Sequence, residues 1–153
     1  VTVSLSIIRP GKATEIDLAD CPDLGPILFT LGCFCSGETV IRNAGRLRLK
    51  ESDRIDAMRD ELQKMGARID VEGDSVHIQG VALHAPNAPL SGHNDHRIVM
   101  ALAVAAIASG LPALLCGAEA VDKSWPAFWN VLRSLGAKIE LSSDRKEDFD
   151  IKA

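Results

Sequence analysis

The chain has 153 residues, a formal net charge of −4 and 4% aromatic residues. This acidic balance with few stacking side chains excludes a general nucleic-acid binder, which is usually basic. The longest strongly apolar run, Ile98 to Ala108, has 11 residues, whereas a membrane-spanning helix needs roughly 20. We therefore expect a cytoplasmic protein of one domain's size that acts on a small molecule, with neither nucleic-acid nor membrane partners.

The first half of the chain predicts a set of strands and helices. Alternation over residues 1–8 predicts a strand, and because the chain opens without an initiator methionine we expect it to belong to a larger protein. The remaining predicted elements are a helix over 24–35, a strand over 39–41, a helix over 53–65, and strands over 67–71 and 75–79.

The second half repeats this order. It predicts a helix over 95–108, a strand over 113–116, a helix over 125–135, and strands over 137–141 and 149–152. The segment from Leu62 to Asp70 recurs 70 residues later from Leu132 to Glu140, which indicates an internal repeat. We predict two βαβαββ units, at about 13–80 and 81–153. The expected fold is α+β, with helices packed inside a shell of mixed sheets.

Three clusters place cations at predicted helix starts: Lys50 to Arg54, Asn94 to Arg97 and Asp122 to Pro126. We expect Ser52, Asn94 and Ser124 to be the N-caps of these helices. A helix N-terminus disfavours positive charge and favours anions, so this placement indicates a site for phosphate or carboxylate groups. Arg46, Arg48 and Lys50 alternate with leucines, which predicts an extended segment with three cations on one face; a solvated sheet face is the alternative.

Two acids lie among these cations and are candidates for proton transfer. Neighbouring charges and partial burial can set the pKa values of Asp23 and Glu51 apart. The alternative for Asp23 is simple N-capping of the helix that follows it. His96 is expected to relay a proton or hold Glu51, with a hydrogen bond at a helix terminus as its alternative. His93 and His96 share a predicted helix face without a recognisable metal-ligand set, so we expect no metal.

The cysteines lie in or next to apolar segments rather than in a spaced framework. This pattern predicts buried, reduced thiols instead of disulfides or a metal site. They are Cys21, Cys33, Cys35 and Cys116.

The segments Leu49–Ile55, Asn94–Arg97 and Lys123–Pro126, with Pro22-Asp23 before an apolar helix, resemble the C-terminal part of the 5-enolpyruvylshikimate-3-phosphate synthases (3-phosphoshikimate 1-carboxyvinyltransferases). The resemblance implies an enolpyruvyl transferase-like alpha-beta prism of two similar lobes with the active site between them. Residues 1–153 are then part of the C-terminal lobe, and the N-terminal lobe is a missing partner. We expect the fragment to be inactive alone.

The resemblance also implies a reaction. The family's enzymes transfer the enolpyruvyl group of phosphoenolpyruvate to the 5-hydroxyl of shikimate 3-phosphate and release phosphate, without metal or organic cofactor. This is a step of the shikimate pathway toward chorismate and the aromatic amino acids. Glyphosate binds in place of phosphoenolpyruvate.

The resemblance assigns catalytic roles to four side chains. Asp23 contacts the 5-hydroxyl and acts as its base, while Glu51 donates a proton to the methylene carbon of phosphoenolpyruvate. His96 supports Glu51, and Lys123 serves both in proton transfer and in substrate binding.

The remaining roles are in substrate binding. Phosphoenolpyruvate is expected to be held by Arg54, Arg97 and Lys123, and shikimate 3-phosphate by Asp23, Lys50 and Arg46. Some family members carry asparagine at the position of Arg46. Three alternatives remain open: a lobe of UDP-N-acetylglucosamine enolpyruvyl transferase, a non-catalytic anion-binding module, and a purely structural repeat domain.

Overall fold

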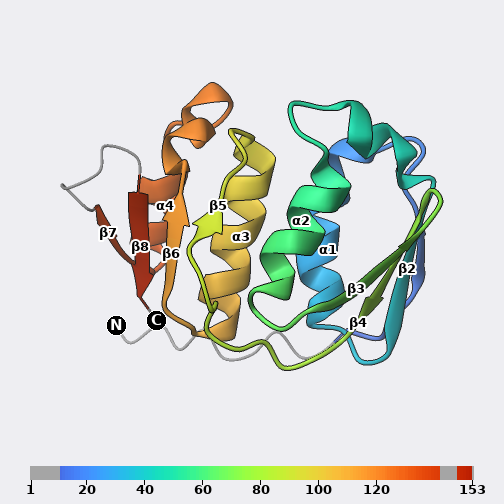
Figure 1. Cartoon of the computed structure of the whole chain (residues 1–153). Coiled ribbons are helices and arrows are strands. Elements are labelled where there is room, and N and C mark those ends of the chain that lie inside the picture. Colours follow the sequence, from blue (N-terminus) through green and yellow to red (C-terminus); the bar gives the residue numbers. More distant parts are fainter. Residues whose placement is uncertain (1–10, 142–147, 153) are drawn as a thin grey trace.

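Two four-stranded sheets lie on opposite sides of three helices in the computed structural model, which describes residues 11–141 and 148–152 (Figure 1). The helices α1, α2 and α3 pack against one another between the sheets. This arrangement confirms the expected α+β fold of βαβαββ units with helices inside mixed sheets. The strand predicted over residues 1–8 lies outside the described residues.

The first half of the chain forms the sheet ordered β1-β2-β4-β3. Pair β1–β2 is parallel, and pairs β2–β4 and β4–β3 are antiparallel. The elements are β1 (Glu15–Asp17), the 3₁₀ helix η1 (Pro22–Leu24), α1 (Gly25–Cys33), β2 (Glu38–Arg42), the 3₁₀ helix η2 (Ala44–Leu49), α2 (Arg54–Gln63), β3 (Arg68–Glu72) and β4 (Ser75–Gln79).

The second half forms a sheet of the same design, ordered β5-β6-β8-β7. Its first pair is again parallel and its other two pairs are antiparallel. The elements are β5 (Leu90–Ser91), α3 (His96–Ser109), β6 (Ala113–Cys116), the 3₁₀ helix η3 (Ala118–Lys123), α4 (Phe128–Ser134), β7 (Lys138–Leu141) and β8 (Asp148–Lys152).

The two halves also end their second helices in the same way. Gly66 and Gly136 both have positive φ, 86° and 99°, the left-handed conformation in which glycine commonly ends a helix. The next residue then donates to a carbonyl five residues back, Ala67 N to Leu62 O at 3.1 Å and Ala137 N to Leu132 O at 3.0 Å. The 70-residue repeat in the sequence is therefore also a repeat of backbone hydrogen bonds.

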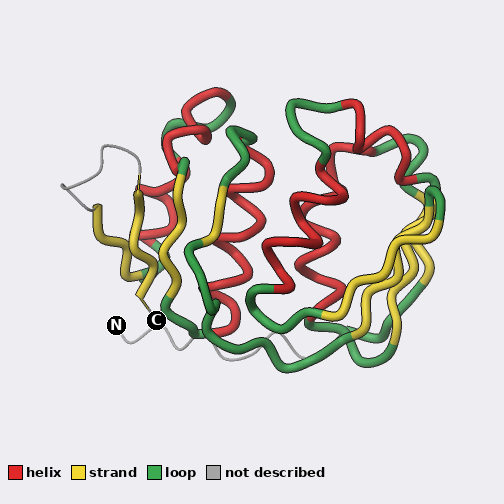
Figure 2. Tube along the Cα trace, in the orientation of Figure 1, coloured by secondary structure: helices red, strands yellow, loops and turns green. Residues whose placement is uncertain are grey.

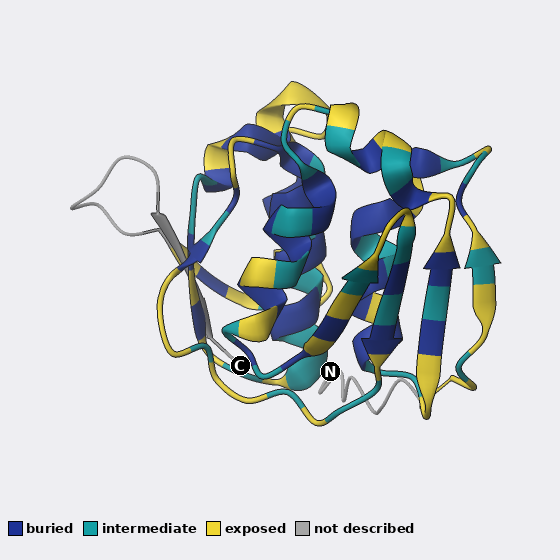
Figure 3. Cartoon of the chain, turned by 45° about the vertical axis from the view of Figure 1, so that its right-hand side comes forward, coloured by how far each residue is buried: buried dark blue, intermediate teal, exposed yellow. Residues whose placement is uncertain are grey.

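The core lies where the helices meet the inner faces of the sheets (Figure 3). One apolar stripe of α2 is fully buried: Ile55, Met58, Leu62 and, just past the helix, Met65. Among the four cysteines, all within the described residues, Cys33 alone is buried; the other three are half-buried, which corrects the expectation for them, and none of the four forms a disulfide. No helix in the described ranges combines the length and the apolar character needed to cross a membrane.

The prediction of an extended segment around Arg46 to Lys50 is wrong, because residues 44–49 form the 3₁₀ helix η2. Ala44 and Leu47, three residues apart, share the buried face of η2, since side chains at this spacing eclipse in a 3₁₀ helix. Leu49 is 86% exposed. Alternation would have placed Leu47 and Leu49 on the same face.

The predicted helix starts are also displaced. Asp53 rather than Ser52 caps α2, and Asp95 rather than Asn94 caps α3, each through its carboxylate. The helix predicted from Trp125 begins at Phe128 without a side-chain cap, so Ser124 is not an N-cap. Trp125 precedes a proline, and that position disfavours helical backbone.

The helices α1, α2 and α3 all begin at the same end of the molecule (Figure 1). After β4 the chain crosses beneath the helices, then rises through β5 to the start of α3 (Figure 2). This path places the residues before α1, α2 and α3 next to one another, although they lie far apart in the sequence.

Candidate active site

A buried ion pair joins the first residue of α2 to the N-cap of α3. The guanidinium of Arg54 donates to Asp95 through Nε at 2.7 Å and through Nη2 at 3.2 Å. Asp95 also accepts from the Ser52 hydroxyl and the Arg97 backbone N–H. Burial favours the neutral form of Asp95, but these hydrogen bonds outweigh it and hold the pKa of Asp95 below its ordinary value.

The carboxylate of Asp23 lies among three cations. It is 3.1 Å from Lys50 Nζ, 3.0 Å from Arg54 Nη1 and 3.2 Å from Arg97 Nη2. The hydrogen bond with Lys50 is the largest influence on the pKa of Asp23 and lowers it. Arg97 and Arg54 lower this pKa further, and the three cations together outweigh burial, which raises it. No N-cap hydrogen bond involves Asp23, so the capping alternative is wrong and its carboxylate is engaged by cations.

Glu51 and His96 form the pair that the sequence predicted. Their Oε2 and Nδ1 atoms lie 3.1 Å apart, with His96 buried and the Glu51 side chain 42% exposed. Carboxylate atoms of Glu51 and Asp95 and a nitrogen of His96 fall within 4.8 Å of one another. Because Asp95 is already occupied by Arg54, Ser52 and Arg97, we interpret this group as a hydrogen-bonded network. His93 precedes α3 and does not share a helix face with His96, which corrects that expectation.

Lys123 lies in the last turn of the 3₁₀ helix η3. The prediction that Lys123 lies at a helix start is therefore wrong, because α4 begins five residues later. Lys123 Nζ donates to the backbone O and the side-chain Oδ1 of Asn94, at 2.7 and 3.0 Å. These two bonds bring Lys123 to the residue that precedes Asp95.

Arg46 and Arg48 do not join these contacts. Arg46 donates to the carbonyl of Ala19, and Arg48 pairs with Asp53 and Asp56 at the start of α2. The patch of three alternating cations is therefore divided by the 3₁₀ turn. Of its members, Lys50 alone contacts Asp23.

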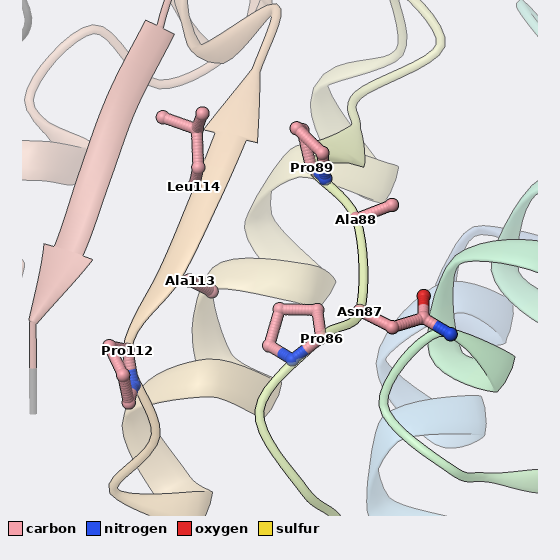
Figure 4. Close-up of a pocket in the computed structure, with 7 residues that line it drawn as sticks. All are labelled: Pro86, Asn87, Ala88, Pro89, Pro112, Ala113 and Leu114. Atoms are coloured by element: carbon pink, nitrogen blue, oxygen red, sulfur yellow. The ribbon is translucent and has the colours of Figure 1, made fainter.

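Several hollows indent the described surface, and three of them differ in their lining. One, of about 230 Å³, lies beside the cluster and is lined by Asp23, Arg97 and mostly apolar side chains such as Met100 and Trp125. A second, of about 330 Å³, includes His93, Asn94 and Glu119. The third, of about 280 Å³, has no charged residue in its lining and is unsuited to an anion (Figure 4); it is formed by Pro86, Asn87, Ala88, Pro89, Pro112, Ala113 and Leu114.

The structure thus brings together seven of the eight predicted site residues. They are connected into one set by side-chain contacts or, for Lys123, by a contact with the chain neighbour of Asp95. The set, called here the anion cluster, comprises Asp23, Lys50, Glu51, Arg54, Asn94, Asp95, His96, Arg97 and Lys123. Guanidinium groups bind carboxylates and phosphates with paired hydrogen bonds, and a carboxylate beside a histidine can exchange protons. Arg46 lies outside the cluster.

Asn94 and Asp95 also belong to the anion cluster, although their sequence context indicated only a helix start. A signal existed for Asp95, since aspartate directly before an apolar helical run is a preferred N-cap. Nothing in the sequence connects Asp95 to Arg54, 41 residues earlier. The two residues meet because α2 and α3 pack side by side in the same direction.

This fold and cluster define the class of protein. The enolpyruvyl transferase NikO from Streptomyces tendae superposes with a TM-score of 0.67 over 88% of this chain and 30% of its own, at 23% identity. An EPSP synthase from Acinetobacter baumannii superposes with a TM-score of 0.73 over 80% of this chain and 29% of its own, at 33% identity. The chain has the fold of enolpyruvyl transferases.

Sequence comparison identifies the particular family. The family model for EPSP synthase (3-phosphoshikimate 1-carboxyvinyltransferase) matches residues 2–132, and the chain belongs to this family. A 3-phosphoshikimate 1-carboxyvinyltransferase of Brachyspira hyodysenteriae is 45% identical over 138 residues, which cover 89% of this chain and 33% of the relative. One from Methanocella arvoryzae is 46% identical over 127 residues, 83% of this chain and 30% of the relative. The chain spans about a third of the length of these relatives.

Proposed function

We propose that this chain is part of the C-terminal lobe of a cytoplasmic enzyme that makes 5-enolpyruvylshikimate 3-phosphate, on the pathway to chorismate and the aromatic amino acids. The observation that carries the proposal is the convergence of Lys50, Arg54 and Arg97 on one carboxylate, that of Asp23. Both proposed substrates, phosphoenolpyruvate and shikimate 3-phosphate, carry a carboxylate and a phosphate. A cluster of cations is suited to such ligands.

In this proposal the cations hold the substrates and the acids move protons. Arg54, Arg97 and Lys123 bind phosphoenolpyruvate, or glyphosate in its place, and Lys50 binds shikimate 3-phosphate. Arg46 contacts Ala19 rather than the cluster, which supports no direct role for it in this conformation. Holding two substrates in register supplies part of the rate, since the reaction is bimolecular.

Proton transfer in the proposal is divided between two carboxyl groups. The 5-hydroxyl oxygen attacks C2 of phosphoenolpyruvate while Asp23 takes the hydroxyl proton and Glu51, held by His96, protonates the methylene carbon. The tetrahedral intermediate then loses phosphate while its methyl group returns a proton to Glu51, which restores the carbon–carbon double bond. Asp23 is paired with cations in this structure, so its role as a base requires substrate anions to take those cations over.

The test is phosphate release by the full-length protein that contains this chain, with phosphoenolpyruvate and shikimate 3-phosphate as substrates. We expect Asp23→Asn and Glu51→Gln to lower kcat by about 100-fold or more, the usual scale of general acid–base catalysis. Glu72→Gln, which removes an acid that is 89% exposed, is the matched control.

The isolated 153-residue chain is expected to release no phosphate and to bind phosphoenolpyruvate weakly, because the contacts of the N-terminal lobe are missing. Turnover by the isolated chain, or full activity of the Asp23 and Glu51 variants, would contradict the proposal. Activity with UDP-N-acetylglucosamine in place of shikimate 3-phosphate would assign the chain to the related transferase.

A further inference from the structure

Glu61 is a buried acid on α2 that the proposed mechanism does not use. It is 3% exposed. Its Oε2 accepts hydrogen bonds from the backbone N–H of Ser91 at 2.8 Å and from Lys64 Nζ at 2.7 Å, and its Oε1 lies 3.0 Å from His93 Nε2. Two of these three partners belong to the segment that leads directly into the Asn94–Arg97 part of the anion cluster.

Glu61 and Arg54 act on this segment from the same helix. They are seven residues apart on α2, which is two turns or about 10 Å, so they lie on one face. Arg54 holds Asp95, while Glu61 holds Ser91 and His93. Residues 91–95 are thus fastened to α2 at two separate points.

The backbone between these points has an unusual conformation. His93 and Asn94 have φ of 50° and 55°, in the left-handed region that residues with a Cβ rarely adopt. Lys123 holds the Asn94 end of this turn, and Glu61 holds the His93 end. The direction in which Asp95, His96 and Arg97 leave the turn therefore depends on contacts outside it.

The second half of the chain has no carboxylate at the position equivalent to Glu61. The position 70 residues after Glu61 is Val131, on α4. The helices of both halves end in the same left-handed glycine and the same hydrogen bonds. Burial of a carboxylate is unfavourable unless it is paired, and here the pairing is directed at the segment before the anion cluster.

We propose that Glu61 is a positioning residue for the candidate active site. Its carboxylate fixes the turn at residues 91–94 on α2, so that Asp95 and Arg97 meet Arg54 and Asp23, and His96 meets Glu51. The proposal rests on the proposed function only in treating the anion cluster as the substrate site. The placement itself is measurable without substrate or turnover.

The experiment is ¹⁵N NMR spectroscopy of the chain with Glu61→Gln. The amide keeps the size of the side chain but loses the negative charge that Lys64 meets, and its NH2 group can meet His93 Nε2 only as a donor, whereas the carboxylate can accept from it. We expect the Arg54 Nε–Hε signal and the amide signals of Asp95 and Arg97 to shift. Titration with inorganic phosphate is expected to show at least threefold weaker binding. Asp60→Asn is the matched control, since Asp60 is the neighbouring residue, 55% exposed and paired with Arg59.

His93→Asn gives a second route that does not alter α2. Asparagine tolerates the left-handed backbone better than most residues, but its shorter side chain does not reach Glu61. We expect the same signals to shift as with Glu61→Gln, and this variant decides the matter if Glu61→Gln does not fold. The proposal is overturned if both variants leave the Arg54, Asp95 and Arg97 signals where Asp60→Asn leaves them, even if the thermal midpoint falls. Absence of phosphate release by the full-length protein would contradict the proposed function and leave these shifts unaffected.

Discussion

Arg54 and Asp95 form a buried ion pair that connects two helices, with 2.7 Å between guanidinium Nε and carboxylate Oδ2. Arg54 is 2% exposed and Asp95 is fully buried. Arg54 also reaches Asp23, so one guanidinium at the first position of α2 links residues that lie before α1 and α3. A cation at the first position of a helix is unfavourable for the helix itself, and the two carboxylates offset that effect.

The first prediction concerns the energy of this pair. Asp95→Asn keeps a good N-cap residue but leaves the Arg54 charge buried with its strongest partner removed. We expect the free energy of unfolding to fall by about 3–5 kcal/mol, the usual loss when one member of a buried pair is deleted. Urea denaturation measures it. Glu15→Gln, which breaks the exposed pair with Arg42, is expected to cost far less, since exposed ion pairs contribute little, and equal losses in the two variants would contradict this.

The second prediction concerns acid pH. The folded state lowers the pKa of Asp95 and of Asp23, so their stabilisation is complete above the ordinary carboxyl pKa of about 3.9. It is lost as the pH falls through the lower folded-state values. We therefore expect the difference in unfolding free energy between the native chain and Asp95→Asn to shrink below about pH 4. Urea midpoints at pH 7 and pH 3 measure this difference. A difference that grows on acidification would contradict the prediction.

Much of the fold follows from local sequence patterns. The elements predicted at 39–41, 53–65, 67–71, 75–79, 95–108 and 113–116 agree with the structure within a few residues, because each has a clear apolar period or alternation. The repeat from Leu62 to Leu132 predicts the second unit from the first. The errors fall on Arg46 to Leu49 and on Trp125, where 3₁₀ turns and a proline override the local pattern.

The candidate site is predictable in its members but not in its contacts. Charge at helix starts identified Arg54 and Arg97, and the structure places both there. The same reasoning failed for Lys123, which ends a 3₁₀ helix. The pairing of Asp23 with three cations and the anchoring of His93 by Glu61 depend on long-range packing, for which a single sequence contains no pattern.

The third prediction concerns thiol reactivity. Cys33 is fully buried, and burial raises the pKa of its thiol to about 12. Because the thiolate is the reactive form, we expect a short pulse of iodoacetamide at pH 8 to leave Cys33 unmodified in the folded chain and to label the half-buried Cys35. Both cysteines lie in one tryptic peptide, residues 13–42, so tandem mass spectrometry of that peptide assigns the label to either site. In urea both thiols should react, and rapid labelling of Cys33 without denaturant would be contrary to its burial.

The fourth prediction concerns Gly92, which precedes the turn at His93. A Cβ at this position would lie 2.4 Å from Val99 Cγ2 and 3.0 Å from the carbonyl oxygen of Cys116. Val99 is fully buried, so its side chain or the backbone must shift within a packed core. We expect Gly92→Ala to lower the free energy of unfolding by about 1–3 kcal/mol, measured by urea denaturation. Gly11→Ala, whose Cβ would come no closer than 3.4 Å to another group, is the control and should be nearly neutral; two equal losses would disprove the steric explanation.

The last prediction concerns the carboxylate that occupies the anion cluster. Asp23 pairs with Lys50, Arg54 and Arg97, so an anion that binds these cations has to compete with it. We expect Asp23→Asn to strengthen the binding of inorganic phosphate to the chain by about three- to tenfold, up to about 1.4 kcal/mol. NMR titration at low ionic strength measures this change, since such contacts are screened by salt. Asp17→Asn removes the same charge from a residue hydrogen-bonded to Asn43 outside the cluster, and it should change phosphate binding far less. Equal effects of the two variants would mean that net charge, rather than competition by Asp23, controls the affinity.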